Sequence, residues 1–442
     1  MSRLKFYLTL LLARLVSLAI KVLNRSSGTS FVGLMILKFY PDFLKDCQKY
    51  INGKIITVTG TNGKTTTSSI ITQILEISGK TPVHNAKGAN MLTGIVNVCA
   101  RTIRPFKRFD CAVFESDEAY LSKLYDFIKA DYLLVTNLFR DQLDRYGELD
   151  TTAKKIQEAI DKNPDLKLIL NADDPLVANF NTNHNTVFFG FEDVEFASET
   201  YTSKAPSELF HCKCGNVLKY NKRFFAHEGH YYCDCGYSRP QPNYSAKATI
   251  YDDKIGLEIK HEDKIYNFEF NSIGLYNAYN ALGAIALCLE FGIDTESIQQ
   301  ALSGYKTIFG RAEKTVLNGH DTLIQLIKNP TGASEVLKTV NKNSNLLIAI
   351  NDNYADGRDV SWLWDAEFEA LSDIQKDIIV SGIRANDMAL RLKYAGVSED
   401  KIKVITPLKD AIEYISTKTE QGSSITILPT YTVLLEMNKR GK

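Results

Sequence analysis

The 442-residue sequence has no net charge and no long uninterrupted apolar run. Lysine and arginine together number 52, as do aspartate and glutamate, so the overall charge provides no attraction for nucleic acid. Internal repeats and low-complexity linkers are absent as well. The length suits two or three domains of roughly 100–200 residues each. These features describe a multidomain globular protein whose function must be found in local motifs.

A disulfide framework is also missing, although the chain contains eight cysteines. Four of them are scattered through apolar segments, and the other four cluster between residues 212 and 235. A small secreted domain held together by disulfides would instead have its cysteines distributed in pairs along the whole chain. We therefore expect a reducing compartment, the cytoplasm.

The N-terminus, "MSRLKFYLTLLLARLVSLAIKVLNR", is apolar, but Arg14 and Lys21 interrupt it before about 20 apolar residues accumulate. No small-residue cleavage site follows it, as a signal peptide would require. Its apolar residues recur at helical spacing, which fits a helix packed on a domain or lying on a membrane surface. We expect residues 1–49 to form a helical segment packed on the next domain, and peripheral contact with the inner face of the membrane remains open.

From residue 54 short β-branched runs alternate with helical stretches, for example "KIITVTG", "DCAVFES", "DYLLVTN" and "LKLILNADDP". This alternation predicts a parallel sheet with helical crossovers over residues 50–315. Residues 200–240, rich in cysteine, histidine and tyrosine, interrupt it and are interpreted as an insertion. Four further apolar runs, "SNLLIAI", "KDIIVSG", "IKVIT" and "SSITILPT", predict a smaller α/β domain over residues 316–442.

The segment "TVTGTNGKTTT" places a glycine-rich turn between an apolar strand and a helix. In such a turn backbone N–H groups can surround phosphates, Lys64 supplies positive charge, and the Thr65 hydroxyl can bind Mg²⁺. The predicted nucleotide-binding residues of this loop are Gly60, Thr61, Asn62, Gly63, Lys64, Thr65 and Thr66.

Phosphate-bound Mg²⁺ also needs a carboxylate, and "FESDEAYL" supplies three at the end of a predicted strand. Glu115 is the candidate metal-binding or catalytic residue, whereas Asp117 and Glu118 could equally be solvated residues at a helix start. The next strand ends in "TNLFRDQLDRYG", where Asn137 and Asp141 could face the same cleft.

The insertion contains "HCKCGNVLKYNKRFFAHEGHYYCDCG", with Cys212, Cys214, Cys233 and Cys235 in two Cys-x-Cys-Gly pairs. Four thiolates satisfy a tetrahedral Zn²⁺ site, and a metal would stabilise a segment too small for its own core. The spacing is shorter than the usual Cys-x₂-Cys, so a histidine could replace a strained ligand; the candidates are His211, His227 and His230. We predict a structural zinc ribbon.

Six motifs together resemble the Mur ligase superfamily, which includes folylpolyglutamate synthase: "TGTNGKTTT", "ESDEAYL", "TNLFRDQLDRYG", "NADDP", "GLYNAYNALGA" and "GRAE". The resemblance implies an α/β fold with a central P-loop domain and a smaller Rossmann-like C-terminal domain. It also implies ATP- and Mg²⁺-dependent activation of a carboxylate as an acyl phosphate, followed by attack of an amine. Carried over to this chain, it assigns Asn277, Asn280 and Arg311 to the nucleotide.

Some positions depart from the superfamily pattern. Gln142 stands where a histidine is usual, which puts a second metal site in doubt, and Lys328 replaces the histidine of a His-Asn-Pro segment. Lys154 or Lys155 aligns loosely with a lysine that many members carbamylate, although both are also ordinary helix-surface residues. Only about fifty residues precede the loop at Gly60, so no UDP-sugar-binding domain is expected there.

The cysteine insertion and the C-terminal "NDNYADGRDVSW" resemble the MurT-type subunits of lipid II isoglutaminyl synthase. In that family the subunit amidates the α-carboxyl of D-isoglutamate in the lipid II stem peptide. The ammonia comes from a GatD-type glutaminase partner, whose cysteine and histidine are completed by an aspartate from the MurT-type subunit. Asp356 is the favoured catalytic aspartate, but Asp352 and Asp359 remain alternatives, and so does a turn-capping role for all three.

Two other functions fit part of the sequence. One is an amino-acid-adding ligase related to folylpolyglutamate synthase, for which no basic pocket for a carboxylate is evident. The other is a nucleotide-binding scaffold without chemistry, which agrees poorly with the presence of Lys64, Thr65 and Glu115.

Overall fold

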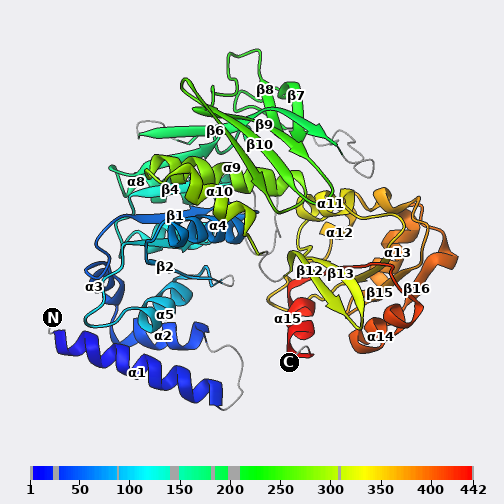
Figure 1. Ribbon diagram of the computed structural model, residues 1–442, viewed down its shortest axis with the longest axis horizontal. Helices are drawn as coiled ribbons and strands as arrows, with labels where there is room; N and C mark the ends of the chain where they lie inside the picture. The colour runs from blue at the N-terminus through cyan, green and yellow to red at the C-terminus, as the bar shows by residue number, and fades with distance from the viewer. Residues whose placement is uncertain are drawn as a thin grey trace.

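The structure is a computed structural model that describes residues 3–22, 29–86, 89–139, 149–180, 185–197, 210–306 and 310–440. Figure 1 shows a large α/β unit with helices at its base, a two-stranded ribbon at its top, and a second α/β unit on the C-terminal side. The functional residues are positioned by the sheets of these two units.

The larger unit contains a nine-stranded sheet with the order β11-β10-β9-β6-β5-β4-β1-β3-β2. The strands predicted from residues 54 to 171 are all present. However, β10 and β11 pair antiparallel, so the sheet is mixed and only the strands from β2 to β9 run parallel. The bounds are β1 Ile55–Thr59, β2 Pro82–His84, β3 Cys111–Glu115, β4 Tyr132–Val135, β5 Lys167–Asn171, β6 Thr186–Phe196, β9 Tyr244–Ile250, β10 Ile255–His261 and β11 Lys264–Phe270.

Helices cover both faces of the parallel part of this sheet because its strands are apolar on both faces. On β1, Ile56 and Val58 pack into one core and Ile55 into the other. One face carries α4 (Lys64–Ile77), α9 (Leu275–Glu290) and α10 (Thr295–Ser303); the other carries α5 (Leu92–Thr102), α6 (Glu118–Leu124) and α8 (Leu149–Asp161). Parallel strands covered in this way bring their carboxyl ends to one edge, where the phosphate loop lies.

Three N-terminal helices extend the second core: α1 (Arg3–Val22), α2 (Thr29–Phe39) and α3 (Phe43–Gln48). Phe6 of α1 stacks on Phe43 and Tyr50, and Leu10 and Ala13 are buried beside it. Among the residues described, no helix is both long and apolar enough to cross a membrane.

The ribbon is an insertion between β6 and β9, and its strands β7 (Lys219–Phe225) and β8 (Glu228–Tyr232) form an antiparallel pair. Asp173, in the turn after β5, holds the ribbon against the sheet. Its carboxylate accepts a hydrogen bond from Arg239 Nε at 2.6 Å, and its backbone oxygen accepts one from Gly229 N at 2.9 Å. The "NADDP" motif therefore has a structural role here.

The C-terminal unit is a six-stranded sheet with the order β12-β13-β17-β14-β15-β16, antiparallel only between β12 and β13. Its strands are β12 Arg311–Leu317, β13 His320–Gln325, β14 Asn345–Ala349, β15 Ile378–Ser381, β16 Ile402–Val404 and β17 Ile425–Pro429. One face of this sheet packs against α11 (Pro330–Lys338), α12 (Trp362–Asp365), η1 (Phe368–Leu371) and α13 (Ala385–Tyr394). The other face packs against α14 (Leu408–Lys418) and α15 (Tyr431–Arg440). A short 3₁₀ helix, η2 (Glu399–Lys401), precedes β16. Because β12 belongs to this sheet, the unit begins near residue 311 rather than at the predicted 316.

Candidate active site

The phosphate loop lies between β1 and α4, at the carboxyl edge of the central sheet. Gly60 and Gly63 both have positive φ, 125° and 85°. A Cβ on Gly60 would lie 2.2 Å from Thr136 Oγ1, and one on Gly63 would lie 1.9 Å from Asn280 Oδ1. Glycine is therefore needed at both positions for conformation and for space. The loop turns sharply enough to direct the N-terminus of α4 at a ligand.

Lys64 is buried at the first position of α4. Its ammonium donates to Glu118 Oε1 at 2.9 Å and to the backbone oxygens of Gly60 and Thr61. Burial lowers the pKa of Lys64, but Glu118, Asp117 and Glu115 together outweigh that effect and leave the pKa raised. The lysine therefore carries a positive charge where phosphates would lie.

Thr65 and Glu115 are brought together from α4 and the end of β3. Thr65 Oγ1 donates to Glu115 Oε1 at 3.0 Å, and Asn90 Nδ2 lies 3.3 Å from the same oxygen. The Glu115 backbone is fixed by Asn85, which both accepts from its N–H and donates to its carbonyl, each at 2.8 Å. A hydroxyl and a carboxylate at this spacing are the hard oxygen ligands that Mg²⁺ prefers, so the pair fits that ion.

The two neighbouring carboxylates have different roles. Asp117 caps α6 by accepting from Ala119 N at 3.0 Å, in agreement with the helix-start alternative. Glu118, by contrast, is buried against Lys64 and is not a solvated residue. Its proximity to Lys64 across 54 positions could not be read from the sequence.

The predicted asparagines surround the loop. Asn137 Oδ1 accepts from Asn62 N at 2.9 Å, which fixes the loop backbone. Asn280 accepts from Thr67 Oγ1 at 3.3 Å and donates to Asn277 Oδ1 at 3.2 Å. Asn277 in turn donates to Ser272 and to the Ile273 carbonyl, so its amide is used within the protein. Of the two, Asn280 lies nearer the loop.

A narrow pocket separates the phosphate loop from the C-terminal unit. Asn329, the N-cap of α11, donates from Nδ2 to Asn62 Oδ1 at 3.0 Å and so joins the two units. Lys328 lines the same pocket. The opposite wall is aromatic, with Phe225, Tyr276 and Tyr279. Aromatic rings on one side and Lys328 and Asn329 on the other are groups that can contact the base and the phosphates of a nucleotide.

Glu228, from the ribbon strand β8, also lines this pocket, and sequence reasoning missed it. Its Oε1 accepts from Asn171 Nδ2 at 2.8 Å, whereas Oε2 is buried without a hydrogen-bond partner in the described structure. Burial, with Asp174, Asp173 and Glu335 nearby, raises the pKa of Glu228 well above its ordinary value. Its sequence neighbours belong to the ribbon, so no local signal in the sequence pointed to a place in this pocket.

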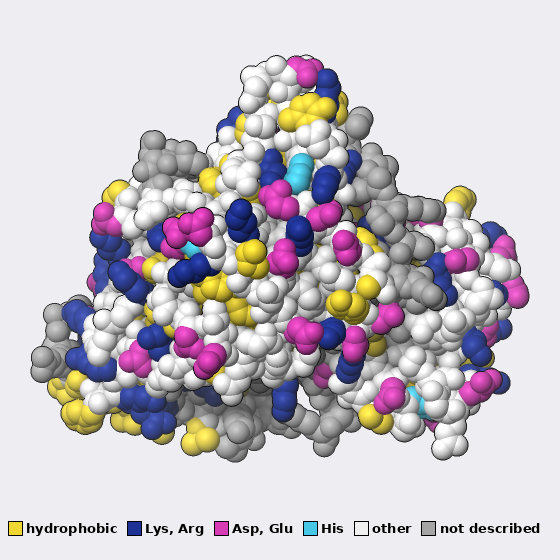
Figure 2. Space-filling model, turned by 45° about the horizontal axis from the view of Figure 1, so that its top comes forward, with side chains coloured by type: hydrophobic (Ala, Val, Ile, Leu, Met, Phe, Trp, Pro, Cys, Tyr) yellow, Lys and Arg dark blue, Asp and Glu magenta, His cyan; other side chains and the backbone are white. Residues whose placement is uncertain are grey.

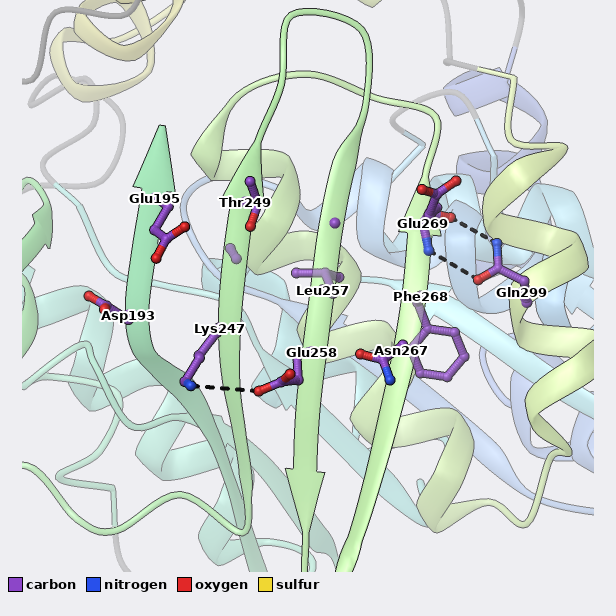
Figure 3. Close-up of a pocket in the computed structure, with 12 residues that line it drawn as sticks. Asp193, Glu195, Lys247, Thr249, Leu257, Glu258, Asn267, Phe268, Glu269 and Gln299 are labelled. Carbon is purple, nitrogen blue, oxygen red and sulfur yellow. Dashed lines mark hydrogen bonds and ion pairs between the residues drawn. The ribbon is translucent and has the colours of Figure 1, made fainter. Parts of the chain in front are cut away.

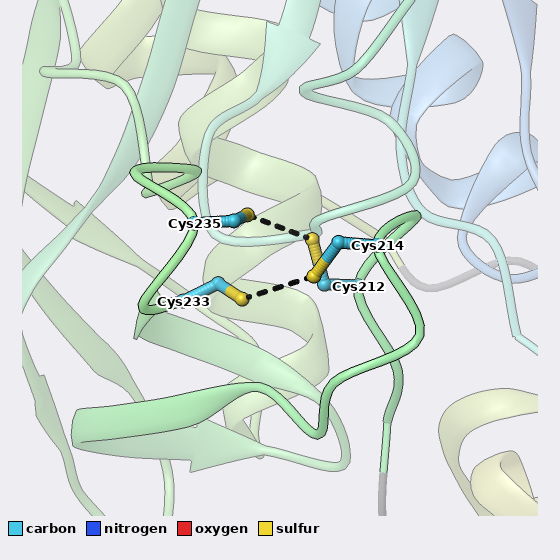
Figure 4. A group of neighbouring side chains, drawn as sticks. All are labelled: Cys212, Cys214, Cys233 and Cys235. Atoms are coloured by element: carbon cyan, nitrogen blue, oxygen red, sulfur yellow. Dashed lines mark hydrogen bonds between the residues drawn. The ribbon is translucent and has the colours of Figure 1, made fainter.

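The four ribbon cysteines lie on two facing loops, one before β7 and one after β8 (Figure 4), and their sulfurs all lie within 4.8 Å of one another. Cys212 and Cys235 are 3.6 Å apart and Cys214 and Cys233 are 3.5 Å apart, with no disulfide among them. A tetrahedral zinc site with Zn–S bonds of about 2.3 Å separates its sulfurs by about 3.8 Å. The four cysteines are therefore compatible with zinc.

The two Cys-x-Cys-Gly turns have the same backbone geometry. Gly215 and Gly236 have φ of 90° and 92°, and their N–H groups donate to the carbonyls of Cys212 and Cys233. These left-handed glycines let two cysteines only two residues apart turn toward one centre. Such a turn explains how the short spacing is accommodated.

The histidines considered as substitute ligands are not part of this cluster. His230 Nε2 is 2.8 Å from the Phe191 carbonyl, and His227 lies between Phe139, Phe210 and Asp174.

The three aspartates after β14 have different partners. Asp352 pairs with Arg384 Nη2 at 2.8 Å, and Asp359 Oδ1 accepts from Ser361 N at 2.8 Å. Asp356 accepts from Thr432 N at 2.7 Å, from Thr432 Oγ1, and from Asn353 N at 3.2 Å. Asp356 therefore links the turn after β14 to the start of α15.

Exposed aromatic side chains occur in this turn and in α12, which follows it. Tyr354 is 86% exposed and Trp364 is 49% exposed, the latter edge-to-face with Tyr394, whereas Trp362 is buried in the core. Exposed aromatic residues of this kind are enriched in protein interfaces.

Comparison with known proteins agrees with this geometry. The MurT ligase C-terminal family matches residues 326–434, and the Mur ligase middle domain family matches residues 58–224. A protein of Streptococcus pneumoniae named "Lipid II isoglutaminyl synthase (glutamine-hydrolyzing) subunit MurT" is 35% identical over 95% of this chain and 93% of its own length. A protein of Staphylococcus aureus with the same name is 33% identical over 96% of this chain and 95% of its own. The chain belongs to the MurT family.

Solved structures place the MurT fold among the Mur ligases. A pseudomurein peptide ligase type C from Methanothermus fervidus has a TM-score of 0.71 and 22% identity, covering 90% of this chain and 80% of its own. MurF from Acinetobacter baumannii has a TM-score of 0.65 and 16% identity, covering 93% and 80%. The predicted α/β fold with a P-loop domain and a smaller Rossmann-like domain is confirmed.

Other predicted positions in this MurT-family chain bear less directly on the site. Asp141 and Gln142 lie outside the described residues, as does the side chain of Arg311, whose backbone begins β12. Lys154 is exposed and Lys155 half-buried on α8.

A second hollow lies far from the phosphate loop, on the outer face of the sheet extension formed by β6, β9, β10 and β11 (Figure 3). Several of its charged side chains form ion pairs, Asp193 with Lys222 and Glu269 with Lys254. Lys247 lies 3.7 Å from Glu258, and Gln299 makes two 3.0 Å hydrogen bonds to the Glu269 backbone. Nothing in this groove resembles the phosphate loop or its carboxylates, so the pocket beside α11 is the candidate active site.

Proposed function

We propose that the protein is the synthetase subunit of a lipid II isoglutaminyl synthase. It would convert the α-carboxyl of D-isoglutamate in the lipid II stem peptide to the amide of D-isoglutamine. ATP would activate the carboxyl, and a GatD-type glutaminase would supply ammonia. The observation that carries the proposal is the combination of a charged phosphate loop with the MurT-type C-terminal unit directly across the pocket.

The nucleotide would lie with its phosphates on residues 60–66 and its base between the aromatic wall and the C-terminal unit. Lys64 would exchange its contact with Glu118 for the outer phosphates, an exchange favoured because phosphate carries more negative charge. Thr65 and Glu115 would hold Mg²⁺, which neutralises phosphate charge when bound. Asn280 and Arg311 would contact the nucleotide, with Asn277 positioning Asn280.

The first chemical step forms a bond between a substrate carboxylate oxygen and the γ-phosphorus, and breaks the bond to ADP. The product is an acyl phosphate, whose carbonyl carbon neutral ammonia then attacks as inorganic phosphate leaves. Lys64 is placed to stabilise charge on the transferring phosphoryl group. Asn329 and Lys328, presented by the C-terminal unit, line the pocket beside the phosphate loop, where they would contact the nucleotide or the acyl phosphate.

Ammonia is protonated and diluted in water, so the proposal requires a stable complex with the glutaminase. Tyr354, in the same turn as Asp356, and Trp364 of α12 are both exposed, which supports the C-terminal unit as the docking face. Asp356 would orient and stabilise the protonated histidine of the partner, as the third member of its catalytic triad. Zinc in the four-cysteine cluster would fix the ribbon, which contributes Phe225 and Glu228 to the nucleotide pocket.

Because the proposed substrate is attached to a lipid, we place the reaction in the cytoplasm at the inner face of the membrane. A protein working there must reach a stem peptide close to the bilayer.

The test is mass spectrometry of a lipid-linked muropeptide incubated with the protein, ATP and Mg²⁺. Ammonium and glutamine are compared, each with and without an active glutaminase partner. We expect amidation with ammonium alone and with glutamine only in the presence of the partner. Amidation under none of these conditions would reject the proposal, and an added amino acid in the product would favour an amino-acid ligase. Absence of substrate-dependent ATP turnover would favour a scaffold.

A further inference from the structure

Helix α1 is apolar on two opposite faces. Phe6, Leu10 and Ala13 are buried against the protein, as expected for one apolar stripe of a surface helix. The opposite face carries a second row, with exposed fractions between 49% and 65%: Leu4, Leu8, Leu11, Leu12, Leu15 and Leu18. A continuous row of exposed leucines is unusual on a soluble surface and indicates a surface that is covered in use.

Neighbouring elements extend this apolar region. Helix α2, which packs beside α1 on α5, exposes Phe31, Leu34 and Phe39 by 61%, 61% and 67%. Phe106, in the connection from α5 to β3, is fully exposed. That connection lies next to α1, because the Arg14 guanidinium donates to the Ile103 carbonyl. We call these exposed residues of α1 and α2, together with Phe106, the N-terminal apolar surface.

Positive charge accompanies the N-terminal apolar surface. The first 41 residues contain no aspartate or glutamate, and their cations whose side chains the structure describes are Lys5, Arg14 and Lys38. Exposed Arg101, Arg104, Lys107 and Arg108 lie on either side of Phe106. Figure 2 shows apolar and Lys/Arg side chains side by side along the lower left edge, where α1 lies. Since the whole chain has no net charge, these cations are balanced by acidic residues elsewhere.

We propose that the N-terminal apolar surface docks the protein on an anionic lipid bilayer. The leucines and phenylalanines would enter the boundary between head groups and acyl chains, and the surrounding cations would contact lipid phosphates. Helix α1 lies in the plane of the bilayer in this arrangement, because its other face is fixed to α5 and Tyr50. Docking of two copies through the same surface is less favourable, since each copy would bring its cations against those of the other.

This surface is independent of the reaction catalysed in the pocket beside α11, so the two proposals can fail separately. If the substrate is lipid-linked, the same docking would also hold the active site near the bilayer.

The experiment is co-sedimentation of the full-length protein with vesicles of phosphatidylcholine alone or of phosphatidylcholine mixed with phosphatidylglycerol. We expect binding to the anionic vesicles, weaker binding to the neutral ones, and weakening by salt because salt screens the cations. The double variant Leu11→Glu/Leu15→Glu should weaken binding about tenfold or more, since two half-exposed leucines no longer enter the apolar layer. Arg104→Glu/Lys107→Glu should remove the preference for anionic lipid. The matched control is Ile265→Glu, a residue of β11 that is 61% exposed and far from α1.

Thermal melting verifies that each variant folds, and ATP turnover with a water-soluble stem peptide and ammonium provides a readout without lipid. Both should be unchanged in the α1 variant. Failure of the wild-type protein to bind anionic vesicles, or equal binding by the α1 variant, would overturn the proposal. Light scattering without lipid gives a further test. A dimer of the wild-type protein that the α1 substitutions convert to a monomer would also overturn the proposal.

Discussion

Replacement of Asp356 by asparagine provides the most direct test of how the C-terminal unit contributes to the proposed reaction. The carboxylate accepts hydrogen bonds from Thr432 N, Thr432 Oγ1 and Asn353 N. An amide at this position turns one acceptor atom into a donor, which costs about 1–3 kcal/mol locally at the start of α15. It also removes the negative charge that would stabilise the partner's protonated histidine. Loss of such a carboxylate lowers turnover by about 10⁴-fold in triad enzymes.

The assay measures lipid II amidation by the complex with glutamine and, separately, with free ammonium. We expect Asp356→Asn to abolish the glutamine-driven reaction and to leave the ammonium-driven reaction within about twofold, because the phosphate loop lies in the other unit. Asp359→Asn, which makes the same charge change at a residue that only caps Ser361 N, is the matched control. Thr432→Val keeps the carboxylate but removes its hydroxyl donor, and it should reduce the glutamine-driven reaction partially. Equal loss with both nitrogen sources would refute the role of Asp356, as would full glutamine-driven activity in the variant.

Three further predictions concern other parts of the chain. Glu115→Gln should lower amidation about 100-fold or more with either nitrogen source, because the Mg²⁺ ligand beside Thr65 loses its charge. Amidation by this variant at the wild-type rate would contradict the prediction. Cys233→Ser should remove the single zinc ion expected per chain, measured by elemental analysis, and lower the melting temperature, whereas Cys288→Ser, outside the ribbon, should retain the zinc. Burial lowers the pKa of His84 to about 4. The unfolded chain therefore takes up a proton below about pH 6.5 that the folded chain takes up only near pH 4, so acidification from pH 8 to 5 costs about 1–2 kcal/mol of stability. The free energy of unfolding in urea should fall less between pH 8 and pH 5 for His84→Gln than for the wild type. The same pH dependence in both proteins would contradict the prediction.

The local motifs of the site could be predicted because each is contiguous in the chain. Gly60, Gly63, Lys64 and Thr65 lie within one turn, and its chemistry follows from the residues and the flanking strand and helix. The Cys-x-Cys-Gly pairs likewise identify a metal-binding type of turn. The apolar strand patterns predicted the parallel sheet, but not the antiparallel β10 and β11, since pairing direction depends on the connections between strands.

Residues that act through long-range contacts could not be predicted in the same way. Glu118 becomes the partner of Lys64 only when β3 lies beside β1, and Asn329 reaches Asn62 across 267 positions. Glu228 lines the pocket beside α11 because Asp173 holds the ribbon against the sheet. Each of these contacts results from packing between distant segments, which leaves no periodic signal in the sequence.

The sequence by itself determined the kind of chemistry: a phosphate loop, a carboxylate for Mg²⁺, a four-cysteine cluster and an apolar, basic N-terminus. Backbone conformation and side-chain chemistry at these places are set by neighbouring residues, so they can be deduced locally. Only the tertiary structure decided which of these groups meet, which aspartate joins the turn after β14 to α15, and which leucines of α1 stay exposed. Burial depends on how the elements pack together in three dimensions. A helix with two apolar faces buries only the face that packs against the rest of the protein, and the sequence does not say which face that is.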